Sequence, residues 1–300
     1  MTDIDREDNI GALKDVIQKN DTVAVFVGAG ASTPLGIKGW SELLKSFATS
    51  HGIDLDVERS IEAKGYPGTA SEIYNRVGDH EKYLQFMSSK FEPRNCLYTS
   101  LHELLMKKFR VIVTTNYDVA FENYCNKNGM PIHTQKLPNF NVLTAFNDKT
   151  IVYLHGNNDD RKYVFLEEEY DCFYPSISGK PGSYEVERFL TPLITNAHLI
   201  FVGFSFDDSY LYRFLTKVIN DTALEYEAHE RVFKTGYSKT DLQHFVIISD
   251  KNQKTIEELS KIDAFRIITY TDDLHVEIQT IIESVLPPSV GAVDEEASHA

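Results

Sequence analysis

Four short segments carry residues that could bind a ligand or move a proton, and each of them ends a run of apolar residues. The segments are Gly28-Ala29-Gly30-Ala31-Ser32, Thr115-Asn116-Tyr117-Asp118, His155-Gly156 and Gly203-Phe204-Ser205. Continuous apolar runs are typical of strands buried on both faces of a parallel sheet. The carboxyl ends of such strands share one edge, so the four segments are expected to converge on a single crevice.

The first segment has the composition of an anion-binding turn. Gly28 and Gly30 lack a Cβ atom, so backbone amides can approach a ligand closely. A helix starting there would direct its amides and the positive end of its dipole at an anion such as a pyrophosphate. Thr33 stands where the dinucleotide-binding fingerprint has its third glycine, so a purely structural turn is the alternative.

Strand and helix patterns alternate along the chain. Strands are predicted at 23–27, 110–116, 150–154, 198–202, 245–248 and 265–270, with a short extra strand at 163–166. Helices are predicted at 10–17, 40–47, 118–128, 184–196, 210–218, 255–262 and 274–286, with Ser41 as the N-cap of the second and a helix or turn opening at 167–170. Residues 131–149 are predicted to be irregular. This alternation favours an α/β fold with a Rossmann-like parallel sheet flanked by helices.

One domain is expected over residues 1–286. Residues 54–109 contain three helical patterns and no convincing strand, which predicts a helical insertion with a turn at Tyr66-Pro67-Gly68. Residues 287–300 consist largely of Pro, Ser, Ala and acidic residues, which predicts a disordered tail.

Charge and cysteine content narrow the functional classes. The net charge of −15 repels polyanions, so neither direct nucleic-acid binding nor binding to an anionic membrane is expected. No run approaches a membrane span, and the polar N-terminus lacks the apolar segment of a signal peptide. Three widely separated cysteines predict neither a disulfide framework nor a paired-cysteine zinc site. The chain is therefore expected to be cytoplasmic and to hold no metal.

Taken in order, the motifs resemble those of the sirtuin family. The resemblance spans residues 23–205 and rests on Gly-Ala-Gly-Ala-Ser-Thr with Gly36-Ile37, Thr-Thr-Asn-Tyr-Asp, Leu-His-Gly and Gly-Phe-Ser. Among sirtuins the chain is most similar to the bacterial sirtuin-like domains that destroy NAD⁺ during phage infection. The resemblance implies that NAD⁺ is the substrate.

The resemblance also implies a role for each matched residue. Gly28, Ala29, Gly30 and Ser32, with the adjoining Thr33, would form the phosphate-binding turn. Asn116 and Asp118 would face the nicotinamide and its ribose, and His155 would be the catalytic histidine. Gly203 and Ser205 would contact the adenosine side of NAD⁺, and Trp40 would replace an aromatic shield. These assignments predict an NAD⁺-binding pocket whose catalytic residues are Asn116 and His155.

Several departures from the sirtuin pattern favour hydrolysis over deacylation. Lys38-Gly39-Trp40-Ser41 replaces Pro-Asp-Phe-Arg, Thr115 replaces a glutamine, and the four-cysteine zinc module is absent. The leading hypothesis is an NAD⁺ glycohydrolase that releases nicotinamide and ADP-ribose as an NAD-depleting effector in antiphage (abortive infection) defence. An NAD-dependent deacylase or ADP-ribosyltransferase, a non-catalytic NAD sensor and a hydride-transferring dehydrogenase are the alternatives.

The chemistry requires a group that holds the ribose and a group that accepts a proton. The Asn116 amide can orient a ribose hydroxyl or a water molecule. His155, with an ordinary pKa of about 6.5, can accept a proton from either of them. Each residue also has a purely structural interpretation: Asn116 could cap the next helix, and His155 could be a buried histidine with its hydrogen bonds satisfied. Asp207-Asp208 is expected to cap a helix rather than bind a metal, and Glu167-Glu168-Glu169 to be a solvated face.

An NAD-destroying activity must be kept inhibited in the host cell until it is needed. The resemblance implies either a homo-oligomer or a complex with a partner protein, such as a HerA-type ATPase or an Argonaute-like protein. The sequence itself identifies no partner surface.

Overall fold

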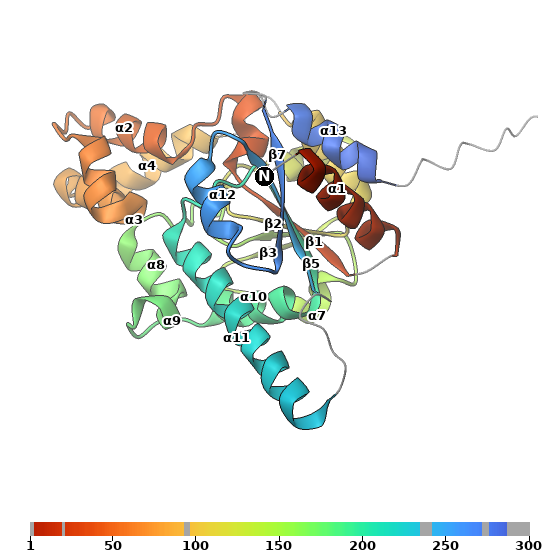
Figure 1. The fold of residues 1–300 in the computed structure, drawn as a ribbon. Helices are drawn as coiled ribbons and strands as arrows, with labels where there is room; N and C mark the ends of the chain where they lie inside the picture. The colour runs from red at the N-terminus through yellow and green to blue at the C-terminus, as the bar shows by residue number, and fades with distance from the viewer. Residues whose placement is uncertain (1–2, 20–21, 93–96, 235–241, 272–275, 287–300) are drawn as a thin grey trace, which may run out of the picture.

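A parallel sheet of seven strands, in the order β3-β4-β2-β1-β5-β6-β7, forms the centre of the computed structural model (Figure 1). The structure describes residues 3–19, 22–92, 97–234, 242–271 and 276–286, so the predicted tail lies outside the described residues. The strands are β1 (Val23–Val27), β2 (Val111–Thr114), β3 (His133–Lys136), β4 (Thr150–Tyr153), β5 (His198–Val202), β6 (His244–Ser249) and β7 (Phe265–Tyr270). The predicted α/β fold with a parallel sheet is confirmed.

Helices cover both faces of this sheet. They are α1 (Asp3–Gln18), α2 (Trp40–Ser50), α3 (Val57–Val77), α4 (His80–Phe91), α5 (Ser100–Lys108), α6 (Ala120–Lys127), α7 (Val142–Ala145), α8 (Glu167–Phe173), α9 (Pro175–Ser178), α10 (Glu185–Asn196), α11 (Ser209–Phe233), α12 (Gln253–Leu259) and α13 (Val276–Val285), with a 3₁₀ helix, η1 (Ala29–Leu35). No helix in the described ranges is long and apolar enough to cross a membrane.

Alternate residues of each central strand enter opposite halves of the core. In β1, Ala24 and Phe26 pack under α8, α10, α11 and α12, whereas Val25 and Val27 pack under α1, α5, α6 and α13. Figure 1 shows α1 and α13 on one side of the sheet and α12 on the other. Burial on both faces explains why these strands are continuous apolar runs.

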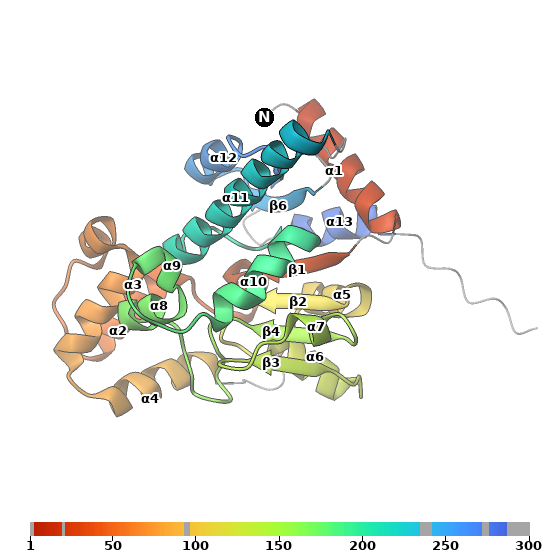
Figure 2. The same ribbon diagram turned by 90° about the horizontal axis from the view of Figure 1, so that it is seen from below.

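A third hydrophobic cluster lies beyond the carboxyl ends of the strands, where α2, α3 and α4 pack around Phe47, Met87 and Phe165 (Figure 2). The helical unit therefore runs from Trp40 to Phe91 and not over 54–109. Helix α5 belongs to the sheet, since Leu105 packs in the core beneath α1 and α13. An amphipathic pattern shows that a helix has an apolar face but not which surface that face meets.

Several local predictions are wrong. Gly39, not Ser41, is the N-cap of α2, and the break within α3 falls at Gly65, one residue before the predicted turn. The region 131–149 contains β3 and α7; β3 was missed because its sequence, His-Thr-Gln-Lys, is polar, as suits the edge of a sheet.

Residues 163–166 are buried but do not form a strand. Their backbone is bound largely by side chains: Tyr117 Oη donates to the carbonyl of Val164, and the Glu169 carboxylate accepts from the amides of Phe165 and Leu166 at 2.7 Å each. Glu169 is thus not part of a solvated face. The apolar pattern correctly indicated burial, whereas the hydrogen-bond partners depended on tertiary structure.

Candidate functional site

The carboxyl ends of four adjacent strands, β4-β2-β1-β5, lie level with one another. Val27 is paired with Thr114 on one side and Val202 on the other, and Thr114 is paired in turn with Tyr153. Gly28, Thr115 and Gly203 follow these strand ends directly, and His155 follows after one further residue, Leu154. The register alone therefore places them side by side at one edge of the sheet.

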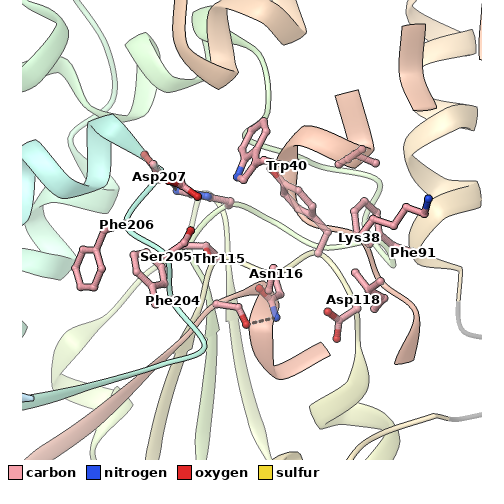
Figure 3. A pocket seen from close by; sticks show the side chains of 17 residues that line it. Lys38, Trp40, Phe91, Thr115, Asn116, Asp118, Phe204, Ser205, Phe206 and Asp207 are labelled. Carbon is pink, nitrogen blue, oxygen red and sulfur yellow. Dashed lines mark hydrogen bonds and ion pairs between the residues drawn. The ribbon is translucent and has the colours of Figure 1, made fainter. Parts of the chain in front are cut away.

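A pocket opens at this edge and is lined by all four segments, so the predicted convergence is confirmed. Its lining residues are Gly28, Ala29, Ile37, Lys38, Trp40, Leu43, Phe91, Thr115, Asn116, Tyr117, Asp118, His155, Phe204, Ser205, Phe206, Asp207 and Asp208. In Figure 3 the segment after β5 lies on one side, Lys38 and Phe91 lie on the other, and Asn116 lies between them. Of the predicted site residues, the four that do not line the pocket are Gly30, Ser32, Thr33 and Gly203.

Two glycine turns interlock at the base of this pocket. The amide of Gly28 donates to Val202 O at 3.0 Å, and that of Gly30 donates to Gly203 O at 2.9 Å. A Cβ atom on Gly28 would lie 2.5 Å from Gly203 O, and one on Gly30 would lie 2.9 Å from Gly203 Cα. These glycines are required by the close approach of two backbones, and their amides bind protein groups. The segment then continues as a 3₁₀ helix, so the expected arrangement of free amides at an α-helix N-terminus is not found here.

Asn116 is fixed by this glycine turn. Its Nδ2 group donates to Gly28 O at 3.1 Å and to Ser32 Oγ at 3.3 Å, the first of which is drawn in Figure 3. Both amide hydrogens are therefore used within the protein, and Oδ1 is the side-chain atom that can accept from a ligand. Asn116 does not cap α6, whose first amide, that of Ala120, is bound by Asp118. Ser32 thus lies behind the pocket and holds a pocket residue.

Asp118 has one carboxylate oxygen with a partner and one without. Oδ1 accepts from the amide of Ala120 at 3.1 Å, whereas Oδ2 is buried with no hydrogen-bond partner. Burial raises the pKa of this carboxyl group. A buried acceptor without a donor is destabilising, so Oδ2 is a natural point of attachment for an N–H or O–H group of a ligand.

The Asp118→Asn variant is expected to be more stable than the wild type at pH 7, by about 1 kcal/mol. The folded-state pKa of Asp118 is raised, so its ionised form opposes folding above the ordinary pKa; asparagine removes the charge and keeps the oxygen that caps α6. Urea unfolding at pH 7 measures the change. Asp56→Asn, at an exposed helix cap, is the control and should change stability by no more than about 0.5 kcal/mol. A decrease larger than in that control would contradict the assignment.

His155 is 2% exposed and both of its ring nitrogens face protein groups. Nε2 lies 2.9 Å from Tyr174 Oη and 3.7 Å from Asp208 Oδ2, and Nδ1 lies 3.5 Å from Tyr170 Oη. Burial lowers the pKa of His155 to about 3, so the ring is neutral at rest and has a lone pair that can accept a proton. The ring also lines the pocket, which a purely structural histidine would not need to do.

The segment after Ser205 contributes more than the sequence indicated. Phe204 and Phe206 form part of the wall, and Asp207 and Asp208 line it as well. As predicted, Asp208 caps α11, accepting from the amides of Tyr210 and Leu211 at 3.1 and 2.9 Å. The described residues contain no group of three or more His, Cys, Asp or Glu side chains arranged to hold a metal ion. In the sequence, the only indication that this segment contributes to the pocket is the adjacent acidic pair Asp207-Asp208, which follows directly after the Gly203-Phe204-Ser205 motif and Phe206.

Trp40, the first residue of α2, also lines the pocket. Its ring is stacked on Phe165, with the centroids 4.9 Å apart and the planes at 5°. This packing fixes the indole in the pocket wall and connects the helical unit to the sheet edge. Trp40 is also the single tryptophan of the chain, so its fluorescence reports directly on this pocket.

Comparison with known proteins agrees with the resemblance to sirtuins that the motifs indicate. The SIR2-like domain model matches residues 110–268, more than half of the chain. The NAD(+) hydrolase ThsA of Acinetobacter baumannii is 24% identical over 280 residues, covering 89% of this chain and 53% of that protein. ThsA of Bacillus cereus is 23% identical, covering 90% of this chain and 52% of that protein. The chain thus spans about half the length of these relatives.

Other similarities are more limited. An NAD-dependent protein deacetylase of Clostridium perfringens is 26% identical over 152 residues, covering 50% of this chain and 60% of that protein. A crystal structure of Sir2 with an inhibitor, 2'-O-acetyl-ADP-ribose and a deacetylated p53 peptide aligns with a TM-score of 0.41 at 14% identity, covering 91% of this chain and 98% of that one.

Proposed function

The chain belongs to the SIR2-like domain family, and we propose that it is an NAD⁺ glycohydrolase that cleaves NAD⁺ to nicotinamide and ADP-ribose. The observation that carries the proposal is the meeting of Asn116, Asp118 and His155 in one pocket at the carboxyl edge of the sheet. The similarity to NAD(+) hydrolases along about nine-tenths of the chain supports the same conclusion.

Each of the three side chains has a part in this reaction. Asn116 Oδ1 accepts a hydrogen bond from a ribose hydroxyl and so fixes the ribose, since its Nδ2 group is already bound. Asp118 Oδ2 accepts from the carboxamide N–H of nicotinamide, which supplies the missing partner of that oxygen. His155 takes the proton of the attacking water, either directly or through a ribose hydroxyl. The electrons of the broken C–N bond leave with nicotinamide and neutralise its pyridinium charge.

Hydrolysis is favoured over transfer to a peptide by the residues at the pocket wall. Thr115 lines the pocket where the sirtuin pattern has a glutamine that handles the peptide-linked intermediate. Lys38 and Trp40 also line the pocket, in the segment where Lys-Gly-Trp-Ser replaces the Pro-Asp-Phe-Arg of the sirtuin pattern and the arginine is therefore missing. Deacylation, ADP-ribosyl transfer and NAD⁺ sensing without turnover are therefore outcomes to be separated by experiment.

The test is incubation of the purified protein with NAD⁺ and no acyl peptide, with nicotinamide and ADP-ribose followed by chromatography. The wild type is expected to release both products, and Asn116→Ala to do so about 100-fold more slowly, because the ribose is no longer held in position. Asn75→Ala, at an exposed position of α3, is the control. Turnover that needs an acetylated peptide would instead identify a deacylase. Quenching of Trp40 fluorescence by NAD⁺ without turnover would identify a sensor.

The proposal also covers where the protein acts and how its activity is controlled. We place the protein in the cytoplasm as an NAD-depleting effector of antiphage defence; among the described residues, Cys125 and Cys172 are free thiols, which is compatible with a reducing compartment. Restraint would come from self-association or from a partner protein such as a HerA-type ATPase or an Argonaute-like protein. Light scattering of the purified chain, alone and with a candidate partner, tests this part.

A further inference from the structure

A buried polar network surrounds the ring of His155, and one of its members, Asp208, also lines the pocket. Tyr170 comes from α8, Tyr174 follows the end of that helix, and Asp208 precedes α11. Tyr170 Oη donates to Asp208 Oδ2 at 3.2 Å and also lies 3.5 Å from His155 Nδ1. Tyr174 Oη lies 2.9 Å from His155 Nε2. Two separate segments, residues 170–174 and Asp208, therefore converge on one imidazole.

The two oxygens of Asp208 have separate tasks. Oδ1 accepts from the first amides of α11, which satisfies the helix cap. Oδ2 is not needed for that cap; it accepts from Tyr170 and lies 3.7 Å from His155 Nε2. A cap alone would not require a carboxylate that is 8% exposed and directed at a histidine, because exposed asparagine or serine caps a helix equally well.

Charge explains what this second oxygen does. When His155 takes a proton it becomes a cation in a buried site, and an isolated buried charge is strongly disfavoured. An ionised carboxylate within about 4 Å favours the charged imidazolium. Tyr170 and Tyr174 are neutral hydroxyl groups that orient the ring but cannot balance its charge.

We propose that Asp208 is a positioning residue for His155: it orients the imidazole through Tyr170 and balances the positive charge that the ring acquires during the reaction. The inference rests on the proposed function, because that reaction supplies the proton. One O–H bond of water breaks and its proton goes to His155, while the oxygen forms the new bond to the ribose carbon. The proton then leaves to solvent, and Asp208 stays ionised throughout.

The test is Asp208→Asn, which keeps the cap of α11 and removes the charge. Its kcat for nicotinamide release is expected to fall 10- to 100-fold with KM within about threefold of the wild type. The control is Asp79→Asn, which changes an equivalent helix cap on α4 far from the pocket and should leave kcat unchanged. Tyr170→Phe removes the link to His155 without touching the cap and is expected to lower kcat about fivefold. It decides the question if Asp208→Asn does not fold.

The dependence of kcat on pH gives a second readout that a helix cap alone would not move. Burial and the neighbouring Asp207 raise the pKa of Asp208 to about 6, against hydrogen bonds from Tyr170 and two backbone amides. Wild-type kcat should therefore fall as the pH drops through about 6, when Asp208 takes up a proton and no longer balances the charge on His155. In Asp208→Asn that fall should be absent, because the group that titrates there has been replaced by a neutral amide.

Ring resonances of His155 in histidine-labelled protein, assigned with His155→Ala, test the contact without any turnover. They are expected to shift in Asp208→Asn and not in Asp79→Asn. Unchanged resonances, or an active wild type matched by Asp208→Asn in kcat and pH profile, would overturn the inference. If the wild type does not cleave NAD⁺ but the His155 resonances still shift in Asp208→Asn, the proposed function is rejected and the contact between Asp208 and His155 is supported.

Discussion

Replacing His155 with alanine is expected to slow nicotinamide release from NAD⁺ by about 10²- to 10⁴-fold, the usual contribution of a positioned general base. The ring is neutral at rest because burial lowers its pKa to about 3, and it stands in the pocket wall with Asn116. Single-turnover rates measure the chemical step, and quenching of Trp40 fluorescence measures NAD⁺ binding in the same samples. Binding should stay within a few-fold of the wild type, because the change removes a proton acceptor and not the groups proposed to hold the ribose.

The matched control for this change is His133→Ala, since His133 is exposed on the edge strand β3. It should cleave NAD⁺ at the wild-type rate. Equal rates for His155→Ala and the wild type would mean that water is activated elsewhere, and a loss of binding in His155→Ala would mean that the histidine holds the substrate.

The sequence was sufficient to predict the meeting of the four segments because a parallel sheet leaves little freedom. Once Val23–Val27 and its neighbours are recognised as buried parallel strands, their carboxyl ends must share an edge, and Asn116 and His155 each lie two residues beyond such an end. Strand periodicity and the motifs at the strand ends thus determined the place of the candidate site. The assigned roles of its residues remain predictions.

The surroundings of His155 could not be predicted in the same way. Tyr170 and Tyr174 belong to a helical segment whose path over the sheet depends on packing, and tyrosines are so frequent in this chain that the pattern favours a core role for each. Asp208 could be recognised as a helix cap from local sequence, but its contact with His155 joins β4 to α11 through the fold. Contacts between non-adjacent elements depend on tertiary geometry, which local patterns do not contain.

Gly203→Ala is expected to destabilise the protein by about 2 to 5 kcal/mol, the second large effect. A Cβ atom at this position would lie 2.6 Å from the backbone nitrogen of Ala31, and the residue has a φ of +60°. The left-handed conformation costs about 1 to 2 kcal/mol for a residue with a side chain, and forced overpacking adds about 1 to 3 kcal/mol. Urea unfolding followed by Trp40 fluorescence measures the sum.

Gly36→Ala separates these two contributions. Gly36 has a similar φ of +77°, but a Cβ atom there would have no neighbour within 4 Å. It should therefore lose only the conformational part, about 1 to 2 kcal/mol. The excess in Gly203→Ala measures how tightly the turn after β1 is held against the turn after β5, and hence how well Ala29 and Ser205 are kept on one pocket wall. Equal losses in the two variants would show that the turns can separate without penalty, and the pocket would then owe its shape to Asn116 and the helical unit instead.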